Sequence, residues 1–244
     1  MNWGFIMNNK LVASSIMRNE ANRYLERCLT DLEEYCDEIV ILDDASEDES
    51  VEIAESFEKT TVYKLKESLM IHNESLARGL IWKNFLPHHS PRWVLSIDMD
   101  EFIDPRFKEE KDKWLSLRYP NQLVFKIIET WGSESKVRID KAWNYISKDT
   151  SVITRWLPES NYFLSPQSLH GGRIPLNQPG PILSTPYFLV HHGYANPDDI
   201  IKKREFYQKR DPNPNPTMAA HYDSMWDENP ELIDLDLFVP GGMG

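Results

Sequence analysis

The sequence predicts an α/β fold with a mostly parallel central sheet flanked by helices. Short apolar runs of strand length alternate with amphipathic helical patterns through residues 11–97, and polar residues follow several of these runs. Alternation of this kind favours parallel strands joined by right-handed crossovers. A length of 244 residues suffices for one sizeable core. We therefore expect a single domain over residues 1–244, with one half over 1–105 and a second over 106–244.

Composition excludes several classes of protein. The formal net charge of −12 argues against a nucleic-acid partner, although a bound metal can still attract an anionic ligand. No apolar stretch reaches the roughly 18 residues that span a membrane, and the N-terminus lacks a signal-peptide pattern. Cys28 and Cys36 would lie too far apart on one helix for a disulfide. We expect a soluble, cytoplasmic protein without an integral membrane segment and with reduced cysteines.

The first half alternates strands and helices in a regular order. Expected strands are 11–17, 38–42, 61–65 and 93–97, and expected helices cover 25–36, 51–57 and 76–85. Ser46 and Glu49 have the spacing of a capping box, which predicts that the second helix begins there.

Polar residues gather where these strands end. They are Asn19, Glu20, Asp43, Asp44, Asp98 and Asp100. Ligands of open parallel sheets bind beyond the carboxyl ends of the strands. Helix capping would explain Ser46 and Asp48, but it does not explain the two carboxylate pairs. The positions therefore predict a binding site at this edge of the sheet.

The most informative stretch is the apolar run 93–97 and the acidic residues after it. Asp98 and Asp100 are one residue apart, so their side chains are expected on the same side of the chain. Two such carboxylates repel each other, and Mg²⁺ or Mn²⁺ with phosphate oxygens in its shell would relieve the repulsion. The alternative is an acidic turn exposed to water.

Four segments together resemble the family 2 glycosyltransferases of the GT-A fold. They are Ala13-Ser14-Ser15-Ile16-Met17-Arg18-Asn19-Glu20-Ala21, Ile39-Val40-Ile41-Leu42-Asp43-Asp44-Ala45-Ser46-Glu47-Asp48, Ala77-Arg78-Gly79-Leu80 and Ile97-Asp98-Met99-Asp100-Glu101-Phe102. The resemblance covers residues 1–105 and makes this the nucleotide-binding half. It implies a metal-dependent, inverting, hexosyltransferase-type enzyme. Such an enzyme moves a sugar from a nucleotide-diphosphate sugar, here most simply a UDP-sugar, to the hydroxyl of a glycan or other acceptor.

The same resemblance implies roles for individual residues. The nucleotide would be contacted by Asn19, Glu20, Asp43 or Asp44, Arg78 and Asp98. The metal would be held by Asp98, Asp100 and a late histidine, His191 or His192. Family members often have Asn where this chain has Gly79, so the pattern around Arg78 departs from the family.

The second half is less regular and is expected to serve the acceptor. Expected strands are 122–129, 137–140 and 186–190, with His191 and His192 at the end of the last one. Asn196-Pro197 starts a basic helix. Its aromatic residues could stack on sugar rings in an acceptor groove or build a core of large side chains; they are Trp131, Trp143, Trp156, Tyr162 and Phe163.

Inversion at the sugar needs a base that takes the proton of the acceptor hydroxyl. The candidates are His170, Asp140 and Glu159. Two other classes of protein remain open: a metal-dependent phosphohydrolase, and a catalytically silent nucleotide- or sugar-binding protein. Phosphohydrolases of this kind usually carry their acidic strand early in the chain, whereas here three strand–helix units precede it.

Overall fold

The computed structural model describes residues 9–140, 143, 149–158, 160–165 and 172–240. The chain divides into two compact units. The first comprises Met1–Asp100, Arg106–Val124 and Ser151–Thr185, and the second comprises Glu101–Pro105, Phe125–Thr150 and Pro186–Gly244.

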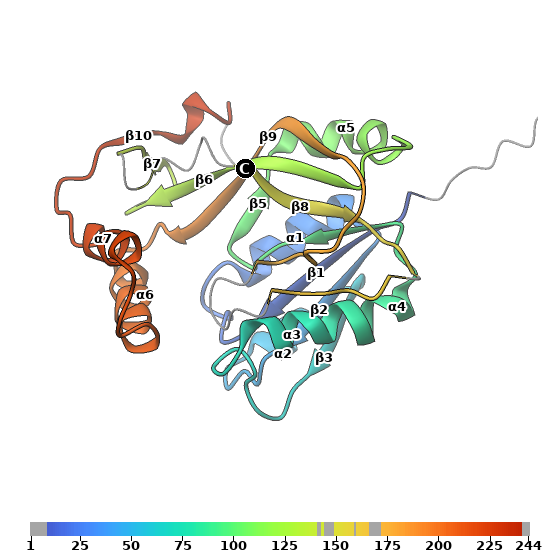
Figure 1. Ribbon diagram of the computed structural model, residues 1–244, viewed down its shortest axis with the longest axis horizontal. Helices are drawn as coiled ribbons and strands as arrows, with labels where there is room; N and C mark the ends of the chain where they lie inside the picture. The colour runs from blue at the N-terminus through green and yellow to red at the C-terminus, as the bar shows by residue number, and fades with distance from the viewer. Residues whose placement is uncertain (1–8, 141–142, 144–148, 159, 166–171, 241–244) are drawn as a thin grey trace, which may run out of the picture. The chain divides into compact units, whose positions relative to one another are not determined.

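Four parallel strands form the centre of the first unit (Figure 1). They are β1 (Leu11–Met17), β2 (Glu38–Asp43), β3 (Thr60–Lys64) and β4 (Trp93–Ser96). β1 pairs with β2 on one side and with β4 on the other, and β3 pairs with β2. β8 (Asp149–Arg155) is antiparallel to β4. The predicted mostly parallel sheet is therefore confirmed, with an antiparallel strand beyond β4.

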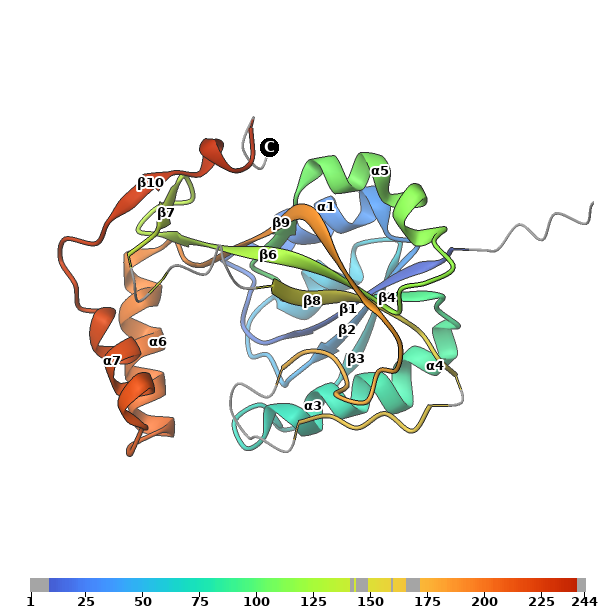
Figure 2. The ribbon, with the colours of Figure 1, turned by 45° about the horizontal axis from the view of Figure 1, so that its top comes forward.

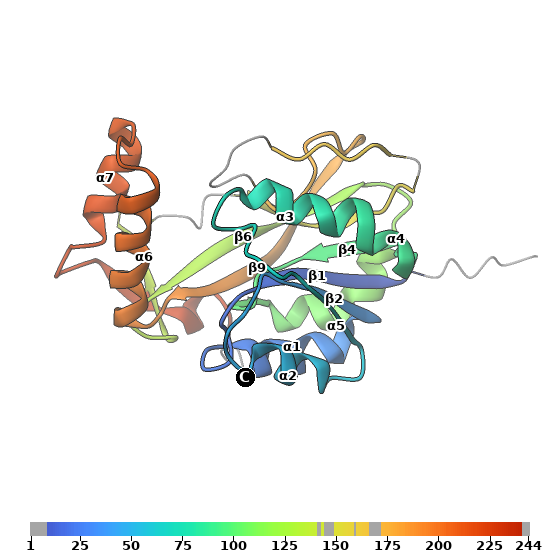
Figure 3. The ribbon, with the colours of Figure 1, turned by 90° about the horizontal axis from the view of Figure 1, so that it is seen from below.

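Helices cover both faces of these parallel strands (Figure 3). On one face lie α1 (Leu25–Tyr35) and α2 (Ser50–Glu55), and on the other lie α3 (Glu74–Leu80), the π-helical turn η1 (Ile81–Phe85) and α4 (Leu86–His89). The predicted helix 76–85 thus corresponds to two consecutive pieces, α3 and η1, and α4 continues beyond its predicted end. Strand residues such as Val12 and Val40 are fully buried against Trp82 of η1. Central parallel strands are apolar on both faces because helices exclude water from both.

The second unit is built from antiparallel strands. They are β5 (Glu101–Ile103), β6 (Gln122–Trp131), β7 (Lys136–Arg138), β9 (Ile182–Tyr194) and β10 (Leu232–Asp234), of which β6 and β9 begin in the first unit. β9 pairs with β5 and β6, and β7 pairs with β6 and β10.

Three further α-helices and a short 3₁₀ helix complete the described elements. α5 spans Pro105–Leu115, α6 spans Pro197–Arg210, α7 spans Pro216–Ser224, and the 3₁₀ helix η3 spans Leu235–Leu237. α6 and α7 lie side by side (Figure 2), with Tyr207 and Tyr222 stacked at 5.2 Å between ring centroids. Asn196 caps α6 as predicted, because its side chain accepts a hydrogen bond from the Asp198 N–H at 2.9 Å. β5, β8, α5, α7 and β10 were not predicted from the sequence.

Most of the aromatic residues that could have lined an acceptor groove are core residues instead. Trp131 and Trp143 pack on each other in the second unit, and Trp156 and Tyr162 pack on Trp82 in the first. These four residues are at most 8% exposed. Of the two alternatives, the core of large side chains therefore holds for them, because large apolar rings gain most when they leave water.

The two histidines do not end a strand. β9 continues through His191 and His192 to Tyr194. Glu101 of β5 pairs with His191, β9 also pairs with β6, and the Gly132 N–H donates to the Tyr194 carbonyl at 2.9 Å. The prediction that they terminate an apolar strand at Val190 is wrong for this reason.

The state of the cysteines agrees with the expectation from the sequence. Cys28 and Cys36 are buried thiols that form no disulfide. Among the residues that the structure describes, no helix combines the length and apolar character of a membrane span.

Candidate functional site

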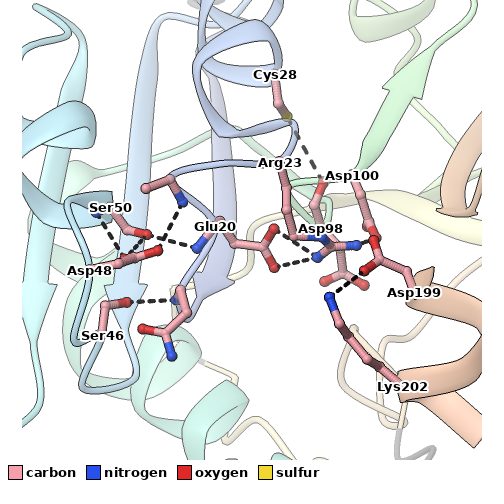
Figure 4. A network of polar contacts seen from close by, with 12 residues as sticks. Glu20, Arg23, Cys28, Ser46, Asp48, Ser50, Asp98, Asp100, Asp199 and Lys202 are labelled. Carbon is pink, nitrogen blue, oxygen red and sulfur yellow. Dashed lines mark hydrogen bonds and ion pairs between the residues drawn. The ribbon is translucent and has the colours of Figure 1, made fainter. Parts of the chain in front are cut away.

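The turn after β1 is tied to the loop after β2 by backbone-directed hydrogen bonds (Figure 4). The N–H of Asn19 donates to Ser46 Oγ at 3.0 Å, and Asn19 Oδ1 accepts from the Glu47 N–H at 2.8 Å. Asn19 and Ala45 both have a positive φ, 54° and 60°. Asn adopts the left-handed region at little cost, whereas Ala is strained there. The strained backbone at Ala45 therefore persists because hydrogen bonds between the two turns hold it in place.

The predicted capping box is wrong. α2 begins at Ser50 with Glu49 at its N-cap, and the Glu49 side chain makes no capping hydrogen bond; Asp48 Oδ1 instead accepts from the Ser50 N–H at 3.0 Å. Ser46 Oγ accepts from the Asn19 N–H instead, and Ser50 Oγ accepts from the Glu20 N–H at 2.7 Å. The capping box does not form because these hydroxyl groups satisfy N–H groups of the turn after β1.

Two buried aspartates at the end of β2 differ in their hydrogen bonds. Asp44 accepts from the N–H groups of Leu69 at 2.7 Å and Met70 at 3.2 Å. It also accepts from the Ser68 hydroxyl. Asp43 accepts through both carboxylate oxygens from the Ser46 N–H, at a long 3.3 Å each, and among the described residues its carboxylate has no shorter hydrogen bond. Asp44 therefore organises the loop after β3, and Asp43 retains more capacity to accept hydrogen bonds.

Asp98 lies between two arginines. Its Oδ1 is 3.3 Å from Arg78 Nη2, and its Oδ2 is 3.6 Å from Arg173 Nη2. The Asp98 side chain is 34% exposed, whereas Arg78 is buried and also pairs with Glu74 at 2.8 Å. Burial alone would lower the pKa of Arg78, but Asp98 and Glu74 together raise it above its ordinary value.

Both arginines are positioned by neighbouring structure. Arg78 lies on α3, whose N-cap Asn73 accepts from the Ser75 N–H at 2.9 Å. Trp82 lies in the π-helical turn and donates its indole N–H to the backbone carbonyl of Arg173 at 3.3 Å. This widened turn thus holds the segment that brings Arg173 to Asp98, and such turns often occur at functional sites.

Asp100 faces a third arginine (Figure 4). Arg23 Nη2 lies 3.5 Å from Asp100 Oδ2, and Arg23 Nη1 donates to both carboxylate oxygens of Glu20, at 2.9 and 2.8 Å. The Cys28 thiol of α1 lies 4.0 Å from the carbonyl oxygen of Asp98, next to the same turn. Asp98 and Asp100 therefore bind different arginines.

These contacts bring most of the predicted site residues together in the first unit. They lie at the end of β2 or on the turns and the helix that follow the parallel strands: Asn19, Glu20, Asp43, Asp44, Arg78, Asp98 and Asp100. Arg23 and Arg173 were not predicted from the sequence. The spacing of Arg23 from Glu20, three residues along a turn, could have suggested an ion pair, whereas nothing local connects Arg173 with Asp98.

The remaining candidates lie in the second unit or outside the described residues. His191 Nδ1 is 2.6 Å from Glu129 Oε2, and its side chain is 17% exposed. His192 is 1% exposed, with its Nδ1 2.9 Å from Thr130 Oγ1. Asp140 pairs with Arg138. His170 and Glu159, the other two base candidates, lie outside the described residues.

The donor set at Asp98 and Asp100 fits a hard divalent cation that is completed by other oxygens. Within the described part of the chain, no group of three or more His, Cys, Asp and Glu side chains is arranged to hold a metal. Mg²⁺ and Mn²⁺ are commonly bound by one or two carboxylates, with substrate phosphates and water filling the shell. Two carboxylates on one turn, of which Asp98 reaches solvent, meet that requirement.

Comparison with known proteins supports the predicted family. Residues 16–111 match the model of the family described as "Glycosyl transferase family 2". The predicted resemblance is confirmed, and the match supports a glycosyltransferase enzyme. A search of curated proteins gave no match.

Solved structures show the same fold. S. aureus TarS 1–349 aligns with a TM-score of 0.53 and 16% identity, over 88% of this chain and 69% of that chain. The longer S. aureus TarS structure aligns with a TM-score of 0.51 and 17% identity, over 88% of this chain and 42% of that chain. This chain thus spans less than half of the longer TarS chain. The predicted GT-A fold is confirmed by these two alignments.

Proposed function

We propose that this chain transfers a sugar from a nucleoside-diphosphate sugar to an acceptor hydroxyl, with a divalent cation held at Asp98 and Asp100. One observation supports this most directly. Carboxylates that follow two parallel strands, β2 and β4, are gathered with arginines in one compact unit, inside the segment that matches the glycosyltransferase family. A strand-end edge of this kind is where α/β folds bind nucleotides.

The contacts of each site residue suggest which part of the nucleotide it binds. Asp43 is the candidate for base recognition, since a carboxylate can accept the imide N–H of uracil; Asp44 is already satisfied by backbone N–H groups. We therefore expect a preference for uridine diphosphate. Arg78 and Arg173 carry the positive charge beside Asp98 that can meet a diphosphate.

When bound, the cation would supply Lewis-acid stabilisation of the charge that develops on the leaving diphosphate. Asp98 and Asp100 would hold it. Of the two late histidines expected as an additional ligand, we regard His191 as the better candidate from its surroundings within the second unit. Glu129 fixes the orientation of the His191 ring through Nδ1, as carboxylates do for metal-binding histidines, whereas His192 is buried and contacts Thr130.

Inversion and its base are the finer part of this proposal. An inverting reaction requires a group that takes the proton of the acceptor hydroxyl. Asp140 is paired with Arg138, which commits its carboxylate to an ion pair in the second unit. His170 and Glu159 therefore remain the candidates for this role.

The proposal is tested by the thermal stability of the protein with nucleotides. UDP should raise the melting temperature with Mn²⁺ present and much less without it, because ligands that bind the folded state stabilise it. Asp100→Ala should fold but lose the Mn²⁺-dependent increment. Asp112→Ala removes an exposed carboxylate of α5 and should keep it. An unchanged Mn²⁺-dependent increment in Asp100→Ala would contradict the metal site.

A glycosyltransferase and a silent binding protein are then separated by turnover. Release of UDP from UDP-sugars should occur in the wild-type protein, slowly with water and faster with a suitable acceptor. It should be lost in Asp100→Ala and kept in Asp112→Ala. Nucleotide binding without turnover against a broad acceptor panel would favour a binding protein instead.

A further inference from the structure

Arg23 is shared between two carboxylates that belong to different segments of the site. Its Nη1 donates to both oxygens of Glu20, at 2.9 and 2.8 Å, and its Nη2 lies 3.5 Å from Asp100. The contact with Glu20 is a short two-oxygen hydrogen bond, whereas the contact with Asp100 is a longer ion pair. The guanidinium is therefore bound firmly on one side and loosely on the other.

The three side chains are partly accessible to water. Exposure is 25% for Arg23, 17% for Glu20 and 11% for Asp100. Contacts at this depth are screened less than surface pairs, yet they can rearrange without opening a core. Figure 4 shows Arg23 between Glu20 and the turn that carries Asp100.

A cation at Asp100 would meet the positive charge of Arg23 at short range. Like charges at such separations repel appreciably wherever the effective dielectric constant is below that of water. The repulsion is reduced if the guanidinium moves toward Glu20, which already binds it through two oxygens. Glu20 is thus placed to bind the Arg23 guanidinium when a metal replaces that guanidinium at Asp100.

We propose that Arg23 is a positioning residue that holds Asp100 while no metal is bound and passes to Glu20 when a divalent cation binds. This inference rests on the proposed function, since it requires a cation at Asp100. It also assigns a role to Glu20 other than contact with the nucleoside. Glu20 makes metal binding easier by taking the guanidinium away from Asp100.

The proposal predicts opposite effects for two neutralising substitutions. Arg23→Gln should bind Mn²⁺ about tenfold more tightly than the wild-type protein, because the competing charge is gone. Glu20→Gln should bind Mn²⁺ about tenfold more weakly, because Asp100 then keeps the whole guanidinium. A purely structural role for this ion pair would weaken Mn²⁺ binding in both variants.

The measurement is calorimetric titration of Mn²⁺ into each folded protein, with and without UDP. The melting temperature without metal gives a second readout. Arg23→Gln should lower it, because Glu20 and Asp100 lose their shared partner, and Mn²⁺ should recover more of the loss than in the wild-type protein. Arg23→Lys keeps the charge and should bind Mn²⁺ close to the wild-type affinity.

Arg27→Gln is the matched control. It removes the same charge from a residue of α1 that follows Arg23 by four positions. It should change Mn²⁺ affinity by less than about twofold, because more distant charges are screened. If the wild-type protein binds Mn²⁺ and Arg23→Gln binds it equally or more weakly, the inference is overturned and the proposed function stands. If neither the wild-type protein nor any variant binds Mn²⁺, with or without UDP, the metal-dependent function and this inference both fail.

Discussion

Each unit of the molecule contains a cluster in which arginine meets aspartates, and the two clusters differ in kind. In the second unit, Arg138 is 1% exposed and pairs with Asp140 and, at 3.1 Å, with Asp227. Its guanidinium lies 4.4 Å from the ring centroid of Trp131 and 5.4 Å from that of Trp143. Arg138 also donates to a backbone carbonyl of α7 at 2.9 Å.

In the first unit, the arginines of the candidate site contact aspartates at longer range. Arg173 and Arg23 are 17% and 25% exposed and lie 3.6 and 3.5 Å from Asp98 and Asp100. A ligand can replace such contacts at small cost, whereas a buried and fully bonded guanidinium has no replacement. The difference teaches that burial and partner distance, rather than residue type, separate an ion pair that builds the fold from one that is available to a ligand.

The largest expected effect tests the structural cluster. Arg138→Gln should lower the free energy of unfolding by about 3–5 kcal/mol, because it leaves Asp140 and Asp227 without their cation and opens the packing between two tryptophans. Urea denaturation followed by tryptophan fluorescence measures the loss. Arg173→Gln, the matched change in the candidate site, should cost less than about 1 kcal/mol. Equal losses in the two variants would break the comparison.

The second prediction compares the neighbouring residues Asp44 and Asp43, of which the first is expected to stabilise the fold and the second to bind the ligand. Asp44→Asn should lower stability by about 2 kcal/mol, because a buried charged acceptor of several hydrogen bonds is replaced by a weaker one. Asp43→Asn should leave the melting temperature nearly unchanged and weaken UDP binding about tenfold, with less effect on ADP, since one good hydrogen bond to a base is lost.

Calorimetry with both nucleotides checks the second half of this prediction. If Asp43→Asn binds UDP and ADP as the wild-type protein does, Asp43 has no part in base recognition. If Asp44→Asn is as stable as the wild-type protein, the buried hydrogen bonds of Asp44 do not organise the loop after β3.

The smallest expected effect concerns the two histidines of β9. His191→Ala should weaken Mn²⁺ binding in the presence of UDP by about tenfold with little loss of stability, because a metal ligand is removed from a partly exposed position. His192→Ala should destabilise the protein and leave Mn²⁺ affinity unchanged, because this ring is buried beside Phe102, with 5.3 Å between ring centroids. If His192→Ala weakens Mn²⁺ binding and His191→Ala only destabilises the protein, His192 is the ligand and His191 is structural.

Mn²⁺ is the informative cation for this test. Imidazole is a good ligand for Mn²⁺ and a poorer one for Mg²⁺, which prefers oxygen. If neither alanine variant changes Mn²⁺ affinity, both histidines are structural, and the carboxylates, diphosphate and water hold the metal.

Much of the first unit was predictable from periodicity. The predicted strand 11–17 coincides with β1, and the predicted strand 38–42 differs from β2 by a single residue at its end. Such strands are recognisable because burial on both faces makes them continuous apolar runs. The polar residues after them could be placed at one edge of the sheet, because the carboxyl ends of parallel strands share that edge.

Local rules failed where distant residues competed for the same groups. The capping-box spacing of Ser46 and Glu49 is genuine, but Ser46 is used by Asn19 on another turn. The His pair looked like a strand end because the apolar run stops there, yet pairing with β5 extends β9 beyond it. Similarly, the aromatic residues of the second half suited either a groove or a core, and burial decided for the core in most of them.

The order of the four parallel strands and of the helices between them, and the edge at which the site forms, could be derived from the sequence alone. Periodicity and strand polarity are local properties, so they can be read along the chain. Only the tertiary structure decided that Arg173 meets Asp98, that Arg23 joins Glu20 to Asp100, and which of the neighbouring aspartates is already satisfied. Ion pairs and burial depend on which segments the fold brings together, and no local pattern encodes that distance.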